Sequence, residues 1–229
     1  MAQTMIDPTS FDRFARDYDR FVGLQPGQNT SWLAGLGLKG ARALDAGCGS
    51  GYAVELLSRD FDEVVGLDLS APMLEIAKAK RSSPGVRYML SDLFDLHDAD
   101  GFDLVFSHTM MHHIADYRAG LEYLKSLVRP GGTVAVIDNV CDWCPTPPRE
   151  VYTQGARRGF PSAVRRLGLR DAWFELRFWH SKPWLAHLLS DRYLTRDQFR
   201  ELYGSVYPGA RFDDLGFALA MSWTAPRAD

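Results

Sequence analysis

Residues 43–52 read Ala43-Leu44-Asp45-Ala46-Gly47-Cys48-Gly49-Ser50-Gly51-Tyr52, and this stretch decides the fold. It begins as an apolar run of strand length, passes through three glycines spaced two residues apart, and continues into a helical pattern. Glycine is needed where a backbone turns sharply and approaches a ligand closely, and the N-terminus of a following helix offers unpaired N–H donors. The stretch therefore predicts a buried strand, a ligand-binding turn and a helix, in that order.

Downstream of this turn, apolar runs of strand length alternate with helical patterns as far as residue 140. This alternation is typical of a parallel sheet with crossover helices. Ser70 is a candidate N-cap for one of the helices, and Arg129-Pro130-Gly131-Gly132 ends another. The predicted strands are 41–45, 63–68, 86–90, 102–107 and 133–138, and the predicted helices are 52–58, 71–80 and 117–128.

Two flanking segments complete the predicted fold. Phe11, Phe14, Tyr18 and Phe21 recur at helical spacing, which predicts an amphipathic helix able to lie over the edge of the sheet. At the other end, a helix from about residue 196 precedes strand-like runs 210–215 and 217–224, which predict an antiparallel hairpin. The expected fold is α/β: a doubly wound, mostly parallel seven-stranded sheet with an antiparallel C-terminal hairpin and a helical cap insertion.

The chain is long enough for one domain with one insertion. More than fifty residues, 141–194, are not needed by the alternation and are too rich in aromatic side chains for a linker. We therefore expect a single domain, 1–229, with an N-terminal helical lid (1–40), a ligand-binding core (41–140), an inserted helical cap (141–194) and a final helix and hairpin (195–229).

The charge pattern bears on the partners of the protein. The chain has 26 Lys and Arg against 29 Asp and Glu, a net charge of −3. Nucleic-acid binding requires basic surface that neutralises phosphates, so we expect no nucleic-acid partner. Residues 149–200, however, hold ten arginines and one lysine against five acidic residues. We interpret these basic residues as solvent-exposed side chains on helix faces or, alternatively, as the source of a positive electrostatic potential that attracts an anionic acceptor.

Cysteine usage and hydropathy bear on the compartment. Cys48, Cys141 and Cys144 are too few for a disulfide framework, which favours a reducing environment. The Cys141–Cys144 pair lacks a second ligand pair and is followed by prolines, so we interpret its spacing as incidental. No apolar run approaches the roughly 18–20 residues of a membrane span, and residues 1–8 lack the pattern of a secretory signal. We expect a cytoplasmic protein without a membrane partner.

The glycine turn does not have the spacing of a dinucleotide site. The Gly-x-Gly-x-x-Gly pattern does not fit, because its last position is Tyr52 when it begins at Gly47 and Val54 when it begins at Gly49. Asp45 precedes the turn instead, and a carboxylate there would repel a phosphate but attract an ammonium group. Asp68 and Asp92 follow the next two predicted strands, where they could accept hydrogen bonds from ribose hydroxyls and an adenine amino group. The three acids together favour an adenosine ligand that carries an amino acid.

Segments 44–51, 64–70, 91–95, 102–114 and 127–138 resemble, in order, the motifs of class I S-adenosylmethionine-dependent methyltransferases, especially small bacterial members that modify metabolites. The resemblance implies S-adenosylmethionine as cofactor and S-adenosylhomocysteine as product. It also implies that the glycines border the methionine part, that Asp68 holds the ribose, and that Leu69 and Leu93 enclose the adenine. The cofactor-binding residues expected on this basis are Tyr18, Asp45, Gly47, Gly49, Gly51, Asp68, Leu69, Met73, Asp92, Leu93 and Ser107.

Methyl transfer from a sulfonium is an in-line displacement in which the protein mainly supplies proximity and a dry site. A base helps only when the acceptor loses a proton, and the candidates are His108, His112 and His113, which follow the fourth predicted strand. Some quinone-biosynthesis relatives have a Glu-x-x-Glu-His metal cluster at this point, whereas this chain has Thr109 and His112 at the glutamate positions. We therefore expect no metal.

The aromatic cap is the expected place of acceptor specificity. We expect a small, aromatic metabolite as acceptor, methylated on oxygen, nitrogen or carbon. The alternative is that the aromatic side chains form only the core of the cap. The candidate acceptor-binding residues are Trp143, Tyr152, Trp179, Trp184 and His187.

Two other functions remain as alternatives. One is an NAD-linked oxidoreductase, against which Asp45 and the glycine spacing argue. The other is a non-catalytic subunit that binds an adenosine ligand, because a fold does not by itself establish activity. The protein is expected to be a monomer or a homodimer.

Overall fold

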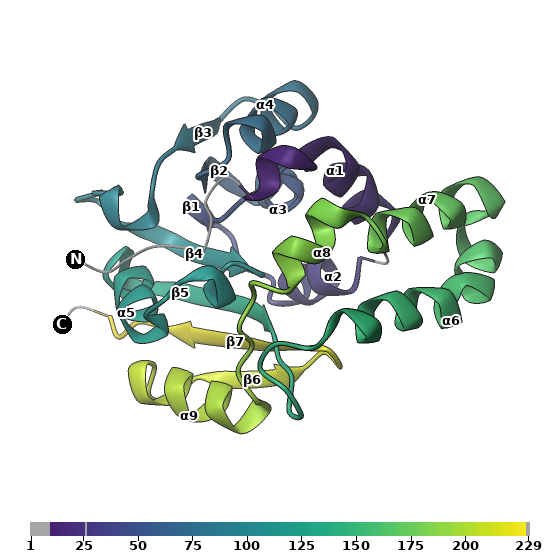
Figure 1. The fold of residues 1–229 in the computed structure, drawn as a ribbon. Helices are drawn as coiled ribbons and strands as arrows, with labels where there is room; N and C mark the ends of the chain where they lie inside the picture. The colour runs from purple at the N-terminus through teal and green to yellow at the C-terminus, as the bar shows by residue number, and fades with distance from the viewer. Residues whose placement is uncertain (1–9, 26, 228–229) are drawn as a thin grey trace.

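The computed structural model describes residues 10–25 and 27–227 (Figure 1). Residues 1–9, which begin the expected N-terminal lid, lie outside the described residues, as do residues 26, 228 and 229. None of the described helices is both long enough and apolar enough to cross a membrane.

The described residues form a seven-stranded sheet in the order β3-β2-β1-β4-β5-β7-β6. The first five strands are parallel, and β7 runs antiparallel to both β5 and β6. The predicted doubly wound sheet with a closing antiparallel hairpin is confirmed. The direction of winding reverses between β1 and β4, which creates a crevice at the carboxyl ends of these strands. The strands are β1 (Gly40–Ala46), β2 (Phe61–Asp68), β3 (Val86–Leu90), β4 (Phe102–His108), β5 (Val128–Asn139), β6 (Arg211–Asp214) and β7 (Ala218–Thr224).

Several helices begin at the residues that the sequence indicates. The Ser70 hydroxyl accepts a hydrogen bond from Met73 N at 3.3 Å, and Thr195 and Gln198 form a reciprocal capping box. The α-helices are α1 (Ala15–Leu24), α2 (Gln28–Gly35), α3 (Tyr52–Leu57), α4 (Ala71–Lys80), α5 (Tyr117–Ser126), α6 (Arg149–Leu167), α7 (Leu169–Trp179), α8 (Lys182–Leu188) and α9 (Arg196–Val206). Short 3₁₀ turns are η1 (Ser10–Arg13), η2 (Leu93–Asp95) and η3 (Met111–His113).

Side chains of the sheet alternate between two hydrophobic cores. Leu44 and Val105 face a core that α5 and α9 complete, whereas Ala43 and Leu104 face a second core with side chains from α2, α3 and α4. These residues have 0% of their surface exposed, as expected for strands covered on both faces. The sheet is therefore held from both sides, and its carboxyl edge is fixed in place for the site.

The lid and the cap share a third cluster. Its buried members are Phe14 and Phe21 from the lid and Phe178, Trp184 and Leu188 from α7 and α8. The Phe21 and Phe178 rings stack with centroids 4.7 Å apart. Figure 1 shows α1 (purple) beside α8, and α6 and α7 (green) projecting from the sheet as a hairpin. The apolar face of the N-terminal helix therefore packs against the cap, while Phe11 and Tyr18 also reach the carboxyl edge of the sheet.

Two predicted boundaries are wrong. The helix predicted from Phe11 to Phe21 is broken at Phe14, whose φ of −141° lies outside the helical region, so η1 precedes α1. The segment 129–132, predicted to end a helix, instead lies within β5, and its register against β4 shifts between Phe102 and Leu104. The Pro-Gly-Gly sequence is thus accommodated as a bulge inside a strand.

A buried ion pair joins the lid to the glycine turn. Arg81, at the end of α4, donates to Asp19 Oδ1 of α1 at 2.9 Å and to the Ser50 carbonyl oxygen at 2.7 Å. The side chains of Asp19 and Arg81 are 3% and 7% exposed, and Lys80 also pairs with Asp19. Burial opposes the charge of Asp19, but hydrogen bonds from Lys80, Ser50 and Arg81 outweigh it and lower its pKa.

Asp19→Asn is expected to lower the free energy of unfolding by about 3 kcal/mol, because it removes the buried counter-charge of Arg81 and leaves this guanidinium only the half-exposed Glu55, 3.5 Å away. Asp17→Asn, at an exposed position of the same helix, is the matched control and should change stability by less than about 0.5 kcal/mol. Urea denaturation of the two variants and the wild type measures the difference. Equal stability of the two variants would contradict this role for Asp19.

Candidate active site

A cavity opens at the carboxyl ends of β1, β2 and β4, beneath the lid. It encloses about 1080 Å³ of space, part of it open to solvent. Its walls come from the lid (Phe11, Tyr18, Val22), the glycine turn and α3 (Asp45, Gly47, Cys48, Gly49, Ser50, Tyr52, Ala53), the ends of β2 and β3 with the start of α4 (Leu67, Asp68, Leu69, Met73, Ser91, Leu93) and the segment after β4 (His108, Thr109, Met110, His113, Ile114).

The glycine turn follows a path that requires glycine. Gly47, Gly49 and Gly51 have φ of 77°, 52° and 89°, a region that other residues rarely adopt. A Cβ at Gly47 would lie 2.5 Å from Met110 Cγ, and one at Gly51 would lie 2.6 Å from the Tyr88 hydroxyl oxygen. A Cβ at Gly49 would meet nothing within 4 Å, because this residue faces the cavity. The turn is therefore packed on its outer side and open on its ligand side.

Asp68 connects the end of β2 to the glycine turn. Its Oδ2 accepts a hydrogen bond from Gly49 N at 2.7 Å, and its Oδ1 accepts one from Ser70 N at 2.8 Å. Burial raises the pKa of Asp68, and these backbone N–H groups oppose the rise. Each carboxylate oxygen has a second lone pair, so Asp68 can still accept ribose hydroxyls from the cavity while it holds the turn.

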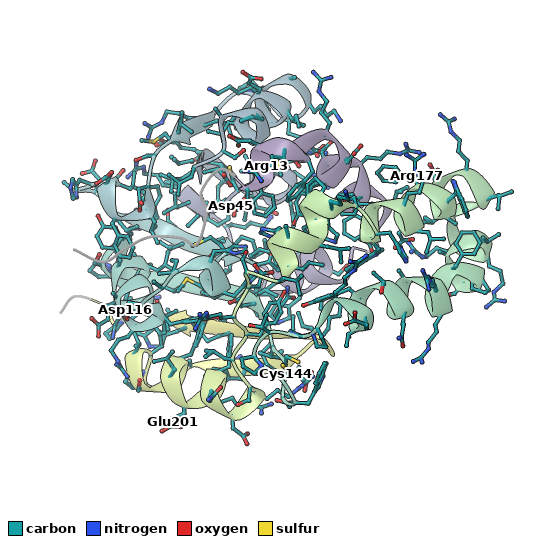
Figure 2. The ribbon with its side chains drawn as sticks, viewed as in Figure 1. Arg13, Asp45, Asp116, Cys144, Arg177 and Glu201 are labelled. Atoms are coloured by element: carbon teal, nitrogen blue, oxygen red, sulfur yellow. The ribbon has the colours of Figure 1, made fainter. Side chains whose placement is uncertain are left out.

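Asp45 is the buried acid of the cavity. Only 2% of its surface is exposed, and Figure 2 labels it in the interior, whereas Arg177 is labelled on the projecting helix α7. Burial, with a contribution from the negative charge of Asp68, raises the pKa of Asp45 to about 8. A cationic group bound beside Asp45 would restore its negative charge.

The expected cofactor residues divide into two groups. Those that line the cavity are Tyr18, Asp45, Gly47, Gly49, Asp68, Leu69, Met73 and Leu93. The other three are not among the lining residues: Gly51 packs against Tyr88, Asp92 caps η2 by accepting from Phe94 N at 3.0 Å, and Ser107 is 0% exposed.

Two of the three candidate catalytic histidines line the cavity. His108, the last residue of β4, has its pKa lowered to about 4, mainly by burial, so its imidazole is neutral and weakly basic. His113 of η3 also lines the cavity, and burial followed by the charge of His112 lowers its pKa. His112 is not among the lining residues.

A buried network lies behind His113. His112 Nδ1 is 2.5 Å from Asp138 Oδ1, and Asp138 is the penultimate residue of β5. Burial opposes protonation of His112, but Asp138 and Asp191 outweigh it and raise its pKa. Asp191 approaches His113 from the cap. Burial likewise opposes the charge of Asp191, yet His113, His112 and His187 lower its pKa to about 2. This network ties the fourth and fifth strands to the cap.

The sequence did not single out Asp138 or Thr109 as a catalytic or binding residue, and it related Asp191 only to His187, four residues earlier, as an oriented base pair or an ordinary side-chain contact. Asp138 closes a strand just as Asp45 and Asp68 do, and that shared position is the signal that could have found it. Asp191 comes from the cap, far along the chain. Thr109 lines the cavity with φ of 51°, and a β-branched residue in that region is strained, as is common at functional sites.

The expected acceptor-binding residues lie away from the cavity lining. Trp143 is 63% exposed, and Trp184 is 6% exposed within the cluster shared by the lid and the cap. Tyr152 and Trp179 line a separate hollow between α6 and α7. His187 is buried, with Nδ1 3.2 Å from the Ser10 hydroxyl oxygen and its ring 4.4 Å from that of Phe11. Phe11 and Tyr18, which line the cavity, contact His187 and Trp184 and so connect these residues to it.

Comparison with known proteins agrees with this geometry. Residues 44–136 match the family model of a methyltransferase domain. An uncharacterized methyltransferase of Mycobacterium tuberculosis is 40% identical over 96 residues, which cover 41% of this chain and 48% of the relative. A malonyl-[acyl-carrier protein] O-methyltransferase of Salmonella typhimurium is 38% identical over 128 residues, which cover 55% and 50%. The chain thus spans about half the length of these curated relatives.

The whole fold also has a solved counterpart. The structure of a DhpI–SAH complex superposes with a TM-score of 0.64 over 100% of both chains, at 20% sequence identity. The family model covers the strands and turns that build the cavity, and the superposition extends the same fold to the lid, the cap and the hairpin. Residues 44–136 thus carry a methyltransferase domain of the class I, Rossmann-like S-adenosylmethionine-dependent type, and the chain as a whole is similar in fold to such proteins.

Proposed function

We propose that this protein transfers the methyl group of S-adenosylmethionine to an oxygen atom of a small acceptor. The observation that carries the proposal is that one cavity contains two kinds of wall. The glycine turn, Asp45 and Asp68 form one wall, and His108 and His113 form another, called the histidine wall below. A methyl donor bound at the first wall would direct its sulfonium toward an acceptor at the second. In-line displacement needs chiefly this alignment in a water-poor site.

The acidic end of the cavity suits the cofactor. The Asp45 carboxylate attracts the ammonium group of the methionine part, and Asp68 accepts the ribose hydroxyls. Leu69, Met73 and Leu93 line the adjoining wall and offer an apolar surface for adenine. A pyrophosphate would instead meet two carboxylates, which argues against the NAD-linked alternative.

The opposite end of the cavity suits an acceptor that carries a hydroxyl group. His113 lines the wall, and its Nδ1 lies 3.3 Å from Asp191 Oδ1, so a carboxylate supports the imidazole beside the acceptor. Deprotonation matters for a hydroxyl acceptor, because the neutral group is a weak nucleophile. The Salmonella relative, by its name, methylates oxygen. The nearby Phe11, Met110 and Ile114 give this end an apolar wall suited to an aromatic or acyl group.

Calorimetric titration with S-adenosylhomocysteine should show one site per chain, whereas NAD should give no signal. Asp68→Asn should weaken the binding by roughly 10- to 100-fold, since a hydrogen bond to a charged group contributes about 1.5 to 3 kcal/mol. Glu75→Gln, an exposed carboxyl on α4, is the matched control and should bind as the wild type does. Binding of NAD, or equal binding by both variants, would contradict the proposed cofactor site.

Cofactor binding should release a proton from Asp45. Below pH 8 the carboxyl of the free protein is largely protonated, and a bound ammonium group favours the charged form. Affinity should therefore rise with pH, by up to about tenfold per unit below 8, and level off above it. Calorimetry in two buffers of different ionisation enthalpy counts the proton. Asp45→Asn should bind more weakly and without this release; the same proton count in wild type and variant would assign it to another group.

A further inference from the structure

Behind the histidine wall, several nitrogen atoms surround one buried carboxylate. Asp191 is 1% exposed. His113 Nδ1 lies 3.3 Å from its Oδ1, His112 Nε2 lies 3.8 Å from its Oδ2, and His187 Nε2 lies 3.9 Å from its Oδ1. One ligand atom from each of His112, His113 and Asp191 lies within 4.8 Å of the others. These three residues are called the His-His-Asp cluster below.

Hydrogen bonding accounts for little of this arrangement. The separations of 3.8 and 3.9 Å exceed the length of a hydrogen bond, and the 3.3 Å contact of His113 Nδ1 with Asp191 Oδ1 lies at its upper limit. Asp191 Oδ1 is fully buried, and no contact of accepted hydrogen-bond geometry reaches it among the described residues. A buried carboxylate oxygen without a partner is costly, and such atoms call for an explanation. A cation between the carboxylate and the imidazoles would supply the missing contact.

The spacing fits a metal ion. Zn²⁺ binds histidine nitrogen and carboxylate oxygen at about 2.0–2.2 Å, which places neighbouring ligand atoms of a tetrahedral site about 3.3–3.5 Å apart. The 3.3 Å separation of His113 Nδ1 from Asp191 Oδ1 matches this edge length, whereas His112 Nε2 lies 3.8 Å from the other oxygen, Oδ2, and the three ligand atoms lie within 4.8 Å of one another. Small rotations of the side chains would complete the geometry.

The surrounding contacts are those that orient metal ligands. His112 presents Nε2 to the cluster because its Nδ1 is held by Asp138, and a carboxylate on the outer nitrogen is the common support of a metal-binding histidine. The Tyr193 hydroxyl donates to Asp191 Oδ2 at 2.8 Å. Both outer partners are buried. Two of the three ligands therefore have their outer contacts in place.

We propose that His112, His113 and Asp191 bind one divalent transition-metal ion of the Zn²⁺ type at the wall of the cavity. Two imidazoles and one carboxylate favour such an ion over Mg²⁺, which prefers oxygen ligands. Three protein ligands leave a further coordination position open, as in catalytic zinc sites. This proposal departs from the sequence expectation of no metal, which considered only the residues after the fourth strand; Asp191 supplies a carboxylate from the cap.

The consequence for catalysis rests on the proposed function. An acceptor hydroxyl that reaches the open position beside His113, the one ligand that lines the cavity, would have its pKa lowered by the ion, so that its proton passes to water in the solvent-exposed part of the cavity. A lone pair of the oxygen then forms the C–O bond as the C–S bond breaks, and the electron pair of that bond returns to sulfur. The products are a methyl ether or ester, S-adenosylhomocysteine and the released proton.

The test is metal binding by the full chain, free of any histidine tag. Equilibrium dialysis should give one Zn²⁺ per chain, which excess Mg²⁺ does not displace, and Co²⁺ should give the visible absorption of a low-coordinate site. Asp191→Asn, which replaces a proposed ligand, should weaken Zn²⁺ binding by more than the roughly 10- to 100-fold that replacement of an outer partner of a metal ligand costs. Tyr193→Phe, which changes only an outer contact, should keep the stoichiometry and lose less. His97→Ala, an exposed histidine outside the cluster, should bind as the wild type does.

Binding of S-adenosylhomocysteine and the thermal transition verify that each variant is folded. If Asp191→Asn does not fold, His113→Gln serves in its place. Failure of the wild type to bind Zn²⁺, or equal binding by wild type and cluster variant, would overturn the metal site. Binding of S-adenosylhomocysteine without Zn²⁺ overturns only this inference, whereas Zn²⁺ binding without S-adenosylhomocysteine overturns only the proposed cofactor site.

Discussion

The carboxylate of Asp68 is the contact on which the rest of the site depends. It ends β2, accepts N–H groups from both Gly49 and Ser70, and so holds the glycine turn of one strand against the helix start of the next. The turn can follow its left-handed path because this carboxylate satisfies Gly49 N, while Gly47 N and Cys48 N donate to the Leu67 carbonyl oxygen. Without this carboxylate, the floor of the cavity would have neither its shape nor its negative charge.

The contacts around this carboxylate reach beyond the turn. Arg81 binds the Ser50 carbonyl oxygen of the turn and Asp19 of the lid, so the same few residues determine the cavity floor and the position of the lid. The lid in turn packs against α7 and α8 through the third hydrophobic cluster. The glycine turn, the lid and the cap are thus connected through buried contacts, although they come from distant parts of the chain.

The sheet order and the glycine turn could be predicted from the sequence because both follow from local patterns: apolar periodicity, helix caps and glycine spacing. The break at Phe14 and the bulge before Thr133 could not, because they depend on packing against the cap and on register with β4. Most expected cofactor residues line the cavity, since strand ends meet at one edge. The contacts of His112 with Asp138 and of His113 with Asp191 join residues far apart in the chain, and no local pattern encodes them.

Phe11 and Tyr18 line the cavity, and the same two rings contact His187 and Trp184 of the cap. A ligand that passes beneath the lid therefore disturbs contacts that also hold the lid to the cap. Under the proposed function, the residence time of the product and the cohesion of the lid would depend on the same aromatic rings. Side chains that never touch the transferred methyl group would then set how fast the spent nucleoside leaves, which limits the turnover of many enzymes.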